Sequence, residues 1–190
     1  MGFMKRFFDL VLASVLLLLL SPLFLILMFL IKVDSAGPVF FAQKRIGKDN
    51  EEFFMFKFRT MRVDTPRDVP THLFHNPQDY VTRVGKVLRK TSLDELPQLW
   101  NILKGEMTFI GPRPALYNQD DLIELRTKCG VHKLRPGVTG WAQVNGRDEI
   151  SIEEKVLLDE YYYKNRSLNL DVKIIVKTLS NVATSKNIKA

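Results

Sequence analysis

Residues 10–31 of the chain read LVLASVLLLLLSPLFLILMFLI, and this stretch decides the architecture. It contains no charged residue, and only Ser14, Ser21 and Pro22 interrupt its apolar character. A helix of this length can cross the hydrocarbon core of a bilayer, which is about 30 Å thick, because each residue adds about 1.5 Å. A cleaved signal peptide is disfavoured, because the run is too long and no small-residue cleavage site closes it. The sequence therefore predicts a membrane helix at the N-terminus.

The centre and the flanks of this run leave three topologies open: a straight span, a signal anchor, and a helix that enters the membrane and returns. Pro22 follows Ser21 near the centre, where it removes a helical hydrogen bond and predicts a kink. Lys5 and Arg6 precede the run and Lys32 follows it, so both flanks are basic. Because basic residues favour the cytoplasmic face, these flanks favour the re-entrant form. A kinked ordinary span is the alternative, since spanning helices tolerate proline.

The rest of the chain has the composition of a single globular domain. Of the 190 residues, 46% are hydrophobic and 26% are charged, which excludes a disordered or collagen-like chain. The single cysteine excludes an internal disulfide framework and a multi-cysteine zinc site. A net charge of +7 indicates an anionic partner: nucleic acid, a membrane surface or a phosphorylated substrate.

A β-hairpin is expected over residues 39–61, with its turn at Gly47–Asn50. The second strand alternates between an apolar and a cationic face, which are formed by Phe54, Phe56 and Phe58 and by Lys57 and Arg59. The apolar face would rest on the membrane helix or, as the alternative, belong to an ordinary core.

Helices are expected at residues 78–89, 95–104 and 118–128, with a short strand at 107–110. A capping box at Ser151–Glu154 predicts the start of another helix. The last helix carries an apolar stripe edged by lysines, formed by Val172, Ile175, Val176, Leu179 and Val182. Such a helix can lie at a membrane interface, and packing of the stripe on the core is the alternative.

Asp94 and Glu95 stand where the helix at 95–104 begins. Ser92 to Glu95 matches a capping box, and the macrodipole stabilises acids at this end, so a purely structural role is the first interpretation. The same geometry would serve catalysis. A helix N-terminus attracts phosphate, and a carboxylate pair can hold Mg²⁺ while one carboxylate attacks phosphorus. Both interpretations stay open on these residues alone.

Arg113 stands between two prolines that restrict its backbone to an extended conformation. A stiff backbone that presents one arginine suits bidentate recognition of phosphate, and an incidental arginine in an exposed turn is the alternative. The glycine-rich segment 133–147 permits close approach of the backbone, and it offers Trp141, Gln143 and Asn145 to a sugar or a base. Nucleic acid is not indicated, because the segment lacks a basic stripe. No P-loop or dinucleotide-binding glycine pattern is present.

Taken together, these segments resemble the bacterial sugar transferase family, the small monotopic phosphoglycosyl transferases. The likeness covers nearly the whole chain, and residues 110–147 are most similar to the capsule and O-antigen members. The motifs that carry it are, in order, Lys5–Asp9, Ser21-Pro22, Gly37–Phe41, Phe56–Met61, Ser92–Leu99, Gly111–Pro114 and Arg135–Arg147.

The resemblance implies a mainly helical α/β fold in the bacterial inner membrane. Residues 1–31 would form a re-entrant helical hairpin broken at Ser21 and Pro22. Residues 32–190 would form a cytoplasmic catalytic domain with a short β-hairpin and interfacial amphipathic helices. The implied reaction moves a sugar-1-phosphate from a UDP-sugar to undecaprenyl phosphate, releases UMP and starts capsule, O-antigen or glycoconjugate assembly.

The resemblance also assigns roles to residues. Asp94 would be the nucleophile that forms a covalent phosphosugar intermediate, and Glu95 would help to bind Mg²⁺. Phosphate or substrate would be bound by Arg89, Arg113, Lys57, Arg59, Gln143, Asn145 and Arg147. The expected partners are the UDP-sugar, undecaprenyl phosphate and membrane lipid, without nucleic acid and with self-association left open. The rivals are a membrane-anchored adaptor, which would release no nucleotide, and a simple glycosyl transferase, which would release UDP.

Overall fold

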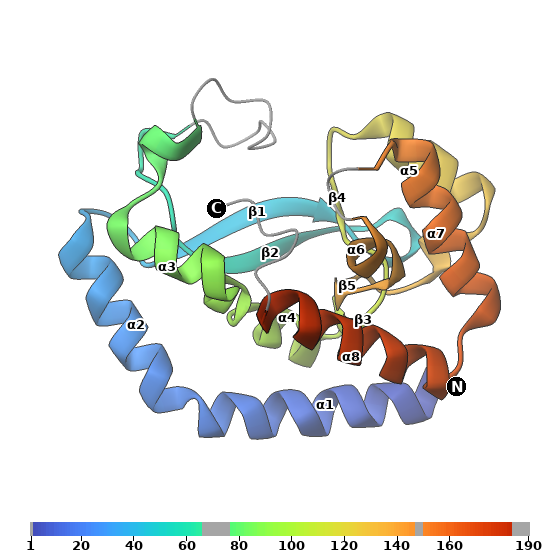
Figure 1. Ribbon diagram of the computed structural model, residues 1–190, viewed down its shortest axis with the longest axis horizontal. Coiled ribbons are helices and arrows are strands. Elements are labelled where there is room, and N and C mark those ends of the chain that lie inside the picture. Colours follow the sequence, from blue (N-terminus) through green and yellow to red (C-terminus); the bar gives the residue numbers. More distant parts are fainter. Residues whose placement is uncertain (1, 66–76, 147–149, 184–190) are drawn as a thin grey trace.

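The computed structural model describes residues 2–65, 77–146 and 150–183 of the chain (Figure 1). It shows a mainly helical α/β fold in which helices surround two small sheets. The elements are α1 (Gly2–Leu19), α2 (Ser21–Asp34), β1 (Phe40–Ile46), β2 (Glu52–Phe58), α3 (Arg83–Thr91), α4 (Gln98–Lys104), β3 (Thr108–Ile110), β4 (Ala115–Leu116), α5 (Asp120–Lys128), β5 (Gly137–Thr139), α6 (Trp141–Asn145), α7 (Ile152–Asn165) and α8 (Leu168–Ala183).

The N-terminal apolar run forms two helices, α1 and α2, that are bent by 62° relative to each other. In Figure 1, α1 follows the lower edge of the molecule and α2 rises along its left side. The kink predicted at Ser21 and Pro22 is confirmed, because Pro22 lies in the first turn of α2 and the Ser21 hydroxyl donates to the Leu18 carbonyl at 2.8 Å. Within the described residues, no single helix is long and apolar enough to cross a membrane. The bent pair together has the length and composition of a broken span or a re-entrant loop.

Polar side chains on α1 bind it tightly to the rest of the chain. Asp9 is only 6% exposed and accepts hydrogen bonds from the Thr108 hydroxyl at 2.7 Å and the Phe109 amide at 3.3 Å. Lys5 and Arg6 are bound in the same way, and their partners are the Tyr162 hydroxyl, the Asp171 carboxylate and the carbonyls of Ile102, Leu103 and Ile110. Helix α1 is therefore joined to the rest of the chain by polar contacts as well as by the covalent backbone.

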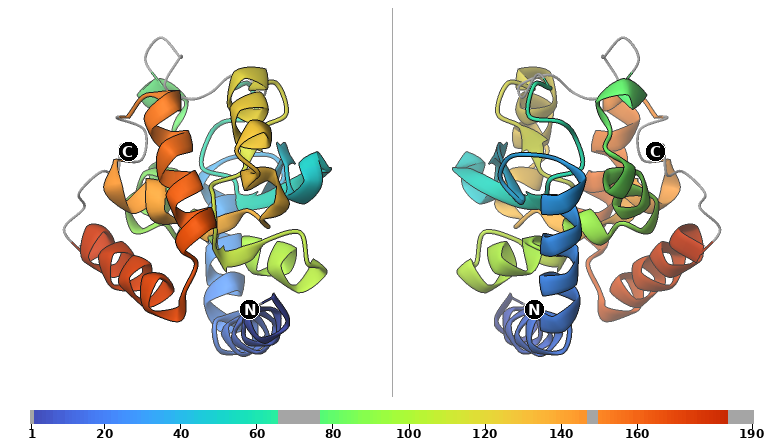
Figure 2. Two further views of the ribbon diagram at one scale, coloured as in Figure 1. Left: turned by 90° about the vertical axis from the view of Figure 1, so that its right-hand side faces the viewer. Right: turned by 90° about the vertical axis from the view of Figure 1, so that its left-hand side faces the viewer.

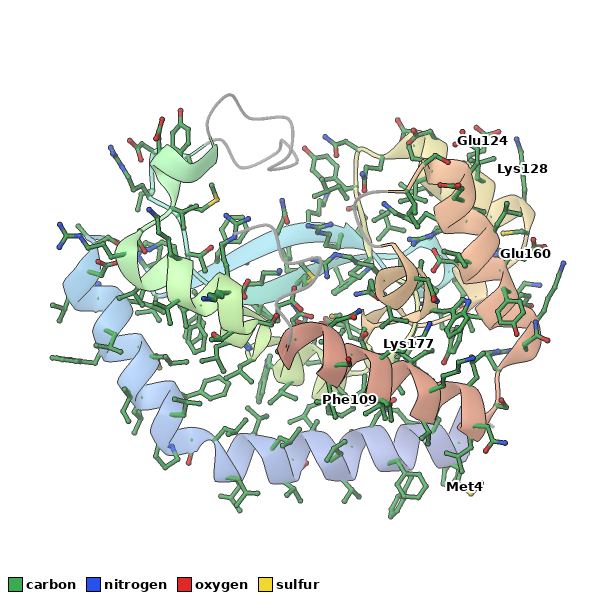
Figure 3. The ribbon with its side chains drawn as sticks, in the orientation of Figure 1. Met4, Phe109, Glu124, Lys128, Glu160 and Lys177 are labelled. Atoms are coloured by element: carbon green, nitrogen blue, oxygen red, sulfur yellow. The ribbon has the colours of Figure 1, made fainter. Side chains whose placement is uncertain are left out.

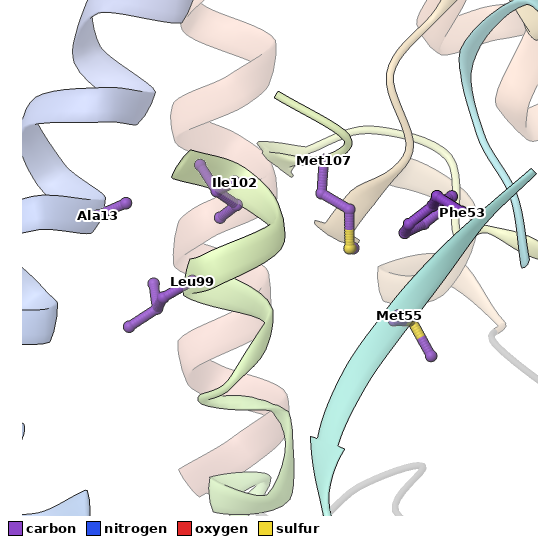
Figure 4. Packing of buried hydrophobic residues seen from close by; sticks show 6 residues of the cluster. All are labelled: Ala13, Phe53, Met55, Leu99, Ile102 and Met107. Atoms are coloured by element: carbon purple, nitrogen blue, oxygen red, sulfur yellow. The ribbon is translucent and has the colours of Figure 1, made fainter. Parts of the chain in front are cut away.

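A shared hydrophobic core explains this attachment of α1. Ala13 of α1 is completely buried and belongs to one cluster with Phe53, Met55, Leu99, Ile102 and Met107. Figure 4 shows Ala13 facing α4, with Phe53 and Met55 of β2 on the other side of that helix. Burial of apolar surface contributes about 25 cal/mol per Å². The helix therefore contributes to the stability of the domain as well as to its surface.

The predicted β-hairpin is confirmed, with β1 and β2 antiparallel and β4 added at the other edge of β1. The expected division of β2 into an apolar and a cationic face is confirmed only in part. Phe58 packs on Leu27 and Ile31 of α2, as expected, whereas Phe54 is exposed. The opposite face, which carries Lys57, buries Phe53 and Met55 against α4. Lys57 therefore lies at the edge of a buried layer.

Most predicted helices occur with slightly shifted ends. The three helices expected at 78–89, 95–104 and 118–128 correspond to α3, α4 and α5, and the expected strand corresponds to β3. The capping box at Ser151 is confirmed by reciprocal hydrogen bonds with Glu154. The capping box at Ser92 is wrong. Ser92 has a left-handed backbone with φ of 57°, ends α3 and caps nothing with its side chain.

The C-terminal helix α8 runs beside α1 on the same side of the molecule (Figures 1 and 2). It packs inward through Ile174 and Leu170, which are buried. The predicted apolar stripe points away from this core, and Val176 and Leu179 are 61% and 65% exposed. Packing of this stripe on the core is therefore excluded.

Candidate active site

Two carboxylates and two cations meet between β2, α4 and the segment after β3. Asp94 and Glu95 lie on a short 3₁₀ helix, Leu93–Glu95, directly ahead of α4 rather than in its first turn. The Lys57 ammonium lies 2.7 Å from Glu95 Oε1 and 3.6 Å from Asp94 Oδ2. Arg113 Nη2 lies 3.4 Å from the same Glu95 oxygen. Four residues from three separate parts of the sequence thus form one charged cluster.

Asp94 is the most deeply buried member of this cluster, with 8% of its surface exposed. Burial raises the pKa of its carboxyl above the ordinary value, and the neighbouring Glu95 charge raises it further. Lys57, Arg89 and Arg113 act in the opposite direction and favour the carboxylate. A buried carboxylate whose charge depends on several cations is typical of active sites, although structural ion-pair networks also perturb pKa values.

Arg113 lies in a backbone segment, residues 112–114, in which each carbonyl accepts a hydrogen bond. Pro112 and Pro114 lack amide hydrogens, so this segment has few donors of its own. The carbonyls of residues 112, 113 and 114 accept hydrogen bonds from the Gly137 amide at 2.8 Å, from Arg126 Nη1 at 2.8 Å and from Arg45 Nη1 at 3.1 Å. The two prolines are expected to make this segment rigid, and hydrogen bonds from two arginine side chains and from strand β5 restrict it further.

Arg126 joins this segment to a buried ion pair. Its guanidinium is forked between the Arg113 carbonyl and the Asp159 carboxylate of α7, and Asp159 is 1% exposed. Arg45 lies on the other side, where burial and the nearby Arg113 charge lower the pKa of Arg45 to about 9. Sequence reasoning missed all three supporting residues. They come from β1, α5 and α7, and no local spacing links them to the Pro-Arg-Pro segment.

The glycines after residue 135 have a different use from the one expected. Close approach occurs, but to the chain itself: a Cβ on Gly137 would lie 2.1 Å from the Gly111 nitrogen, and one on Gly140 would lie 2.1 Å from the Gly111 oxygen. These contacts allow β5 to pair in parallel with β3. The glycines thus fix the backbone immediately before Arg113.

The other predicted binding residues are divided between the cluster and the rest of the molecule. Arg89 lies in the last turn of α3 and acts on the Asp94 charge. Arg59 instead donates to the carbonyls of Ser35 and Ala36, so it secures the end of α2. Asn145 accepts a hydrogen bond from Lys177 of α8 at 2.7 Å, away from the carboxylates. Arg147 lies outside the described residues.

A cleft of about 250 Å³ opens beside the cluster. Glu95, Arg113 and Gln143 contribute to its wall, so Gln143 is the amide of the glycine-rich segment that lies near the carboxylates. The cleft continues between α1, α4 and α8, and most of the surface along it is apolar.

The carboxylate pair is the place where the expected Mg²⁺ would have to bind. Within the described ranges, no group of three or more histidine, cysteine, aspartate or glutamate side chains is arranged to hold one. Mg²⁺ does not need such a group, because it is commonly bound by one or two carboxylates together with water and substrate phosphates. Asp94 and Glu95 meet this requirement, with Glu95 as the expected ligand.

Comparisons with known proteins identify the family of the chain. A family model described as bacterial sugar transferase matches residues 1–185. The exopolysaccharide production protein ExoY of Rhizobium meliloti (strain 1021) is 43% identical, with 97% of this chain and 88% of that protein covered. The uncharacterized sugar transferase EpsL of Bacillus subtilis (strain 168) is 41% identical, with 98% and 90% covered. The UDP-N-acetylgalactosamine-undecaprenyl-phosphate N-acetylgalactosaminephosphotransferase of Aeromonas hydrophila is 43% identical over 96% of this chain but only 44% of its own length. The chain therefore belongs to the bacterial sugar transferase family.

Proposed function

We propose that this protein transfers a sugar-1-phosphate from a UDP-sugar to undecaprenyl phosphate in the assembly of a bacterial surface polysaccharide. The observation that carries the proposal is the buried Asp94 carboxylate in a cluster with Glu95, Lys57 and Arg113. Membership of the family supports the reaction class. A relative named as a phosphotransferase acting on undecaprenyl phosphate supports the substrates.

Asp94 is the nucleophile in the proposed mechanism. Its carboxylate attacks the phosphorus that bears the sugar, an aspartyl–phosphorus bond forms, and the bond from that phosphorus to the bridging oxygen breaks, so UMP leaves. An oxygen of undecaprenyl phosphate then attacks the same phosphorus and releases the Asp94 carboxylate. Both steps bring negative groups together, so neutralisation of charge is the main requirement.

Several cations of the chain meet this requirement. Lys57 and Arg113 lie at the carboxylates, and Arg89 also favours the charged form of Asp94. Arginine is suited to phosphate because its planar fork donates two parallel hydrogen bonds. When bound at Glu95, Mg²⁺ would supply further neutralisation of phosphate oxygens. Fixed charges of this kind stabilise the transition state without reorganisation.

We also propose that α1 and α2 form a re-entrant hairpin in the inner membrane, with the domain in the cytoplasm. Both outer ends of the pair are bound to the same domain. Lys5 and Asp9 hold the start of α1, and the Asp34 carboxylate at the end of α2 accepts from the Val84 amide at 3.0 Å. A straight span would move one of these ends to the opposite side of the membrane and break its contacts.

The decisive experiment is a single half-reaction without the lipid acceptor. Incubation with a labelled UDP-sugar should release one UMP per active protein and leave one phosphosugar on Asp94, located by mass spectrometry. A simple glycosyl transferase would release UDP, and an adaptor would release no nucleotide. A burst of UMP without an adduct, or an adduct on another residue, would overturn the assignment of the nucleophile.

A further inference from the structure

The cleft beside the carboxylates has two chemically different parts. Glu95 and Arg113 form its charged part. Its apolar wall comes from six elements and the turn before α4, and it includes Leu16, Leu96, Leu99, Phe109, Val138 and Val182. Figure 3 shows Phe109 in the space between α1 and α8.

The apolar part of the cleft lies beside the exposed apolar surface of the molecule. Leu16 and Val182 line the cleft, whereas their neighbours Val15 and Leu179 are 46% and 65% exposed. Helix α1 contributes Leu16 to the cleft and α8 contributes Thr178, Asn181 and Val182, whereas other side chains of both helices lie on the outer surface. An apolar ligand in the cleft can therefore continue onto that surface past Leu16 and Val182.

Several hydrogen-bonding groups on the wall are occupied within the protein, whereas Gln143 Oε1 is buried there without a hydrogen-bond partner among the described residues. The hydroxyls of Thr139 and Thr178 bond to each other at 2.7 Å, and Gln143 Nε2 donates to the Val138 carbonyl at 2.8 Å. A sugar nucleotide would place many polar groups against such a wall, which costs free energy unless each finds a partner. A hydrocarbon chain has no such requirement.

The cations near the carboxylates differ in their position relative to the cleft. Arg113 lines the cleft, whereas Lys57 and Arg89 do not. An anionic head with an apolar tail matches the cleft, because the head would meet Arg113 and the tail would follow the apolar wall.

From this arrangement we infer that the cleft binds the phosphate-proximal isoprene units of the acceptor lipid, and that the sugar nucleotide reaches Asp94 from the side of Lys57 and Arg89. This inference rests on the proposed function for the identity of the acceptor. It assigns Leu16, Val138 and Val182 to acceptor binding. It also gives α8 a role in the second half-reaction, in addition to packing on the domain.

Variants that fill the cleft test this assignment in the full-length protein. Leu16→Trp and Val182→Trp should raise the KM for undecaprenyl phosphate at least tenfold. The yield of UMP and of adduct without acceptor should stay as in the unaltered protein. Val176→Trp is the matched control, because Val176 lies on α8 outside the cleft, and it should leave both half-reactions unchanged. A raised KM for the UDP-sugar with slowed adduct formation would place the donor in the cleft and overturn the inference.

A crosslinking experiment needs neither a variant nor turnover. A prenyl phosphate that carries a diazirine on its first isoprene unit should label peptides that contain Leu16, Val138 or Val182, and excess undecaprenyl phosphate should suppress the labelling. Labelling confined to other peptides would show that the cleft does not hold the tail. Absence of the Asp94 adduct would instead contradict the proposed reaction and leave the labelling result intact, so the two failures are distinguishable.

Discussion

Arg113 shows how a functional side chain depends on residues remote in sequence. The two prolines that flank it are visible in the sequence and predict a stiff backbone. The carbonyl partners Arg45 and Arg126 are not, because they come from β1 and α5. Asp94, Glu95, Arg113 and Lys57 were all expected to take part in the reaction or in binding, and the structure brings them together, with the Lys57 ammonium 2.7 Å from Glu95. Sequence patterns thus predict the members of the charged cluster better than the residues that support them.

Replacing Arg113 by lysine should be far from neutral. Lysine keeps the charge but loses the planar fork that suits phosphate. We expect kcat/KM to fall at least tenfold, or about 1.4 kcal/mol. Arg62→Lys is the matched control, because Arg62 pairs with Asp64 on the exposed surface, and it should behave as the unaltered protein. Normal kinetics for Arg113→Lys would show that Arg113 is a turn residue without a role in phosphate binding.

Replacing Arg126 by lysine tests the support of Arg113. A lysine can still pair with Asp159, but one ammonium cannot reproduce the fork that also reaches the Arg113 carbonyl. We expect a several-fold loss of kcat in a protein that still folds. When Arg126→Lys is combined with Arg113→Lys, the two losses should be less than additive, because both act through one guanidinium. Fully additive losses would show that Arg126 acts only on stability.

Asp94→Asn separates catalysis from stability. Because the folded-state pKa of Asp94 is raised, the folded protein binds more protons than the unfolded one, and its stability falls as pH rises above the ordinary aspartate pKa. The asparagine variant lacks this penalty. It should therefore be inactive, and its Tm should gain on that of the unaltered protein between pH 4 and pH 8. A variant that loses Tm relative to the unaltered protein over this range would show that the surrounding cations outweigh burial.

At the scale of elements, local patterns predict most of the fold. The β-hairpin, α4, α5 and the capped start of α7 each follow from periodicity or capping within a few residues. The capping box assigned to Ser92 was wrong, because Ser92 has a left-handed backbone and ends α3. Tertiary packing determines this conformation, and the local sequence does not show it. The attachment of α1 was also missed, since Asp9 and Thr108 meet only in the folded chain.

The bend between α1 and α2 should control topology. Pro22→Leu removes the proline from the first turn of α2, so part of the population should form a continuous helix and span the membrane. Gly2→Cys in a Cys129→Ser background should then become accessible to a membrane-impermeant thiol reagent added outside intact cells. Lys32→Cys in the same background is the control and should stay protected. Labelling of Gly2→Cys without the Pro22 change would overturn the re-entrant topology.

At the scale of the whole molecule, most of the exposed large apolar side chains among the described residues belong to α1, α2 and α8, whose positions are seen in Figures 1 and 2. Phe7, Leu18 and Phe29 are each more than half exposed there, together with Leu179 on α8. Isolated apolar residues are normal on a soluble surface, whereas a continuous apolar face indicates an interaction site. The polar anchors of α1 keep its apolar side turned outward, so the same contacts that stabilise the fold also shape this face.

This geometry predicts that α8 lies in the lipid interface beside α1. A fluorophore attached at Leu179→Cys, in a Cys129→Ser background, should be quenched several-fold more strongly by nitroxide-labelled lipids than one at Leu157→Cys. The two positions are matched, because Leu179 and Leu157 are 65% and 64% exposed and only Leu179 belongs to the α8 stripe. The full chain is required, since Ala13 and Asp9 make α1 part of the domain. Equal quenching at the two positions would mean that the stripe faces water or another protein. The acceptor tail would then have to leave its cleft without passing α8, and the second half-reaction would depend on α1 alone.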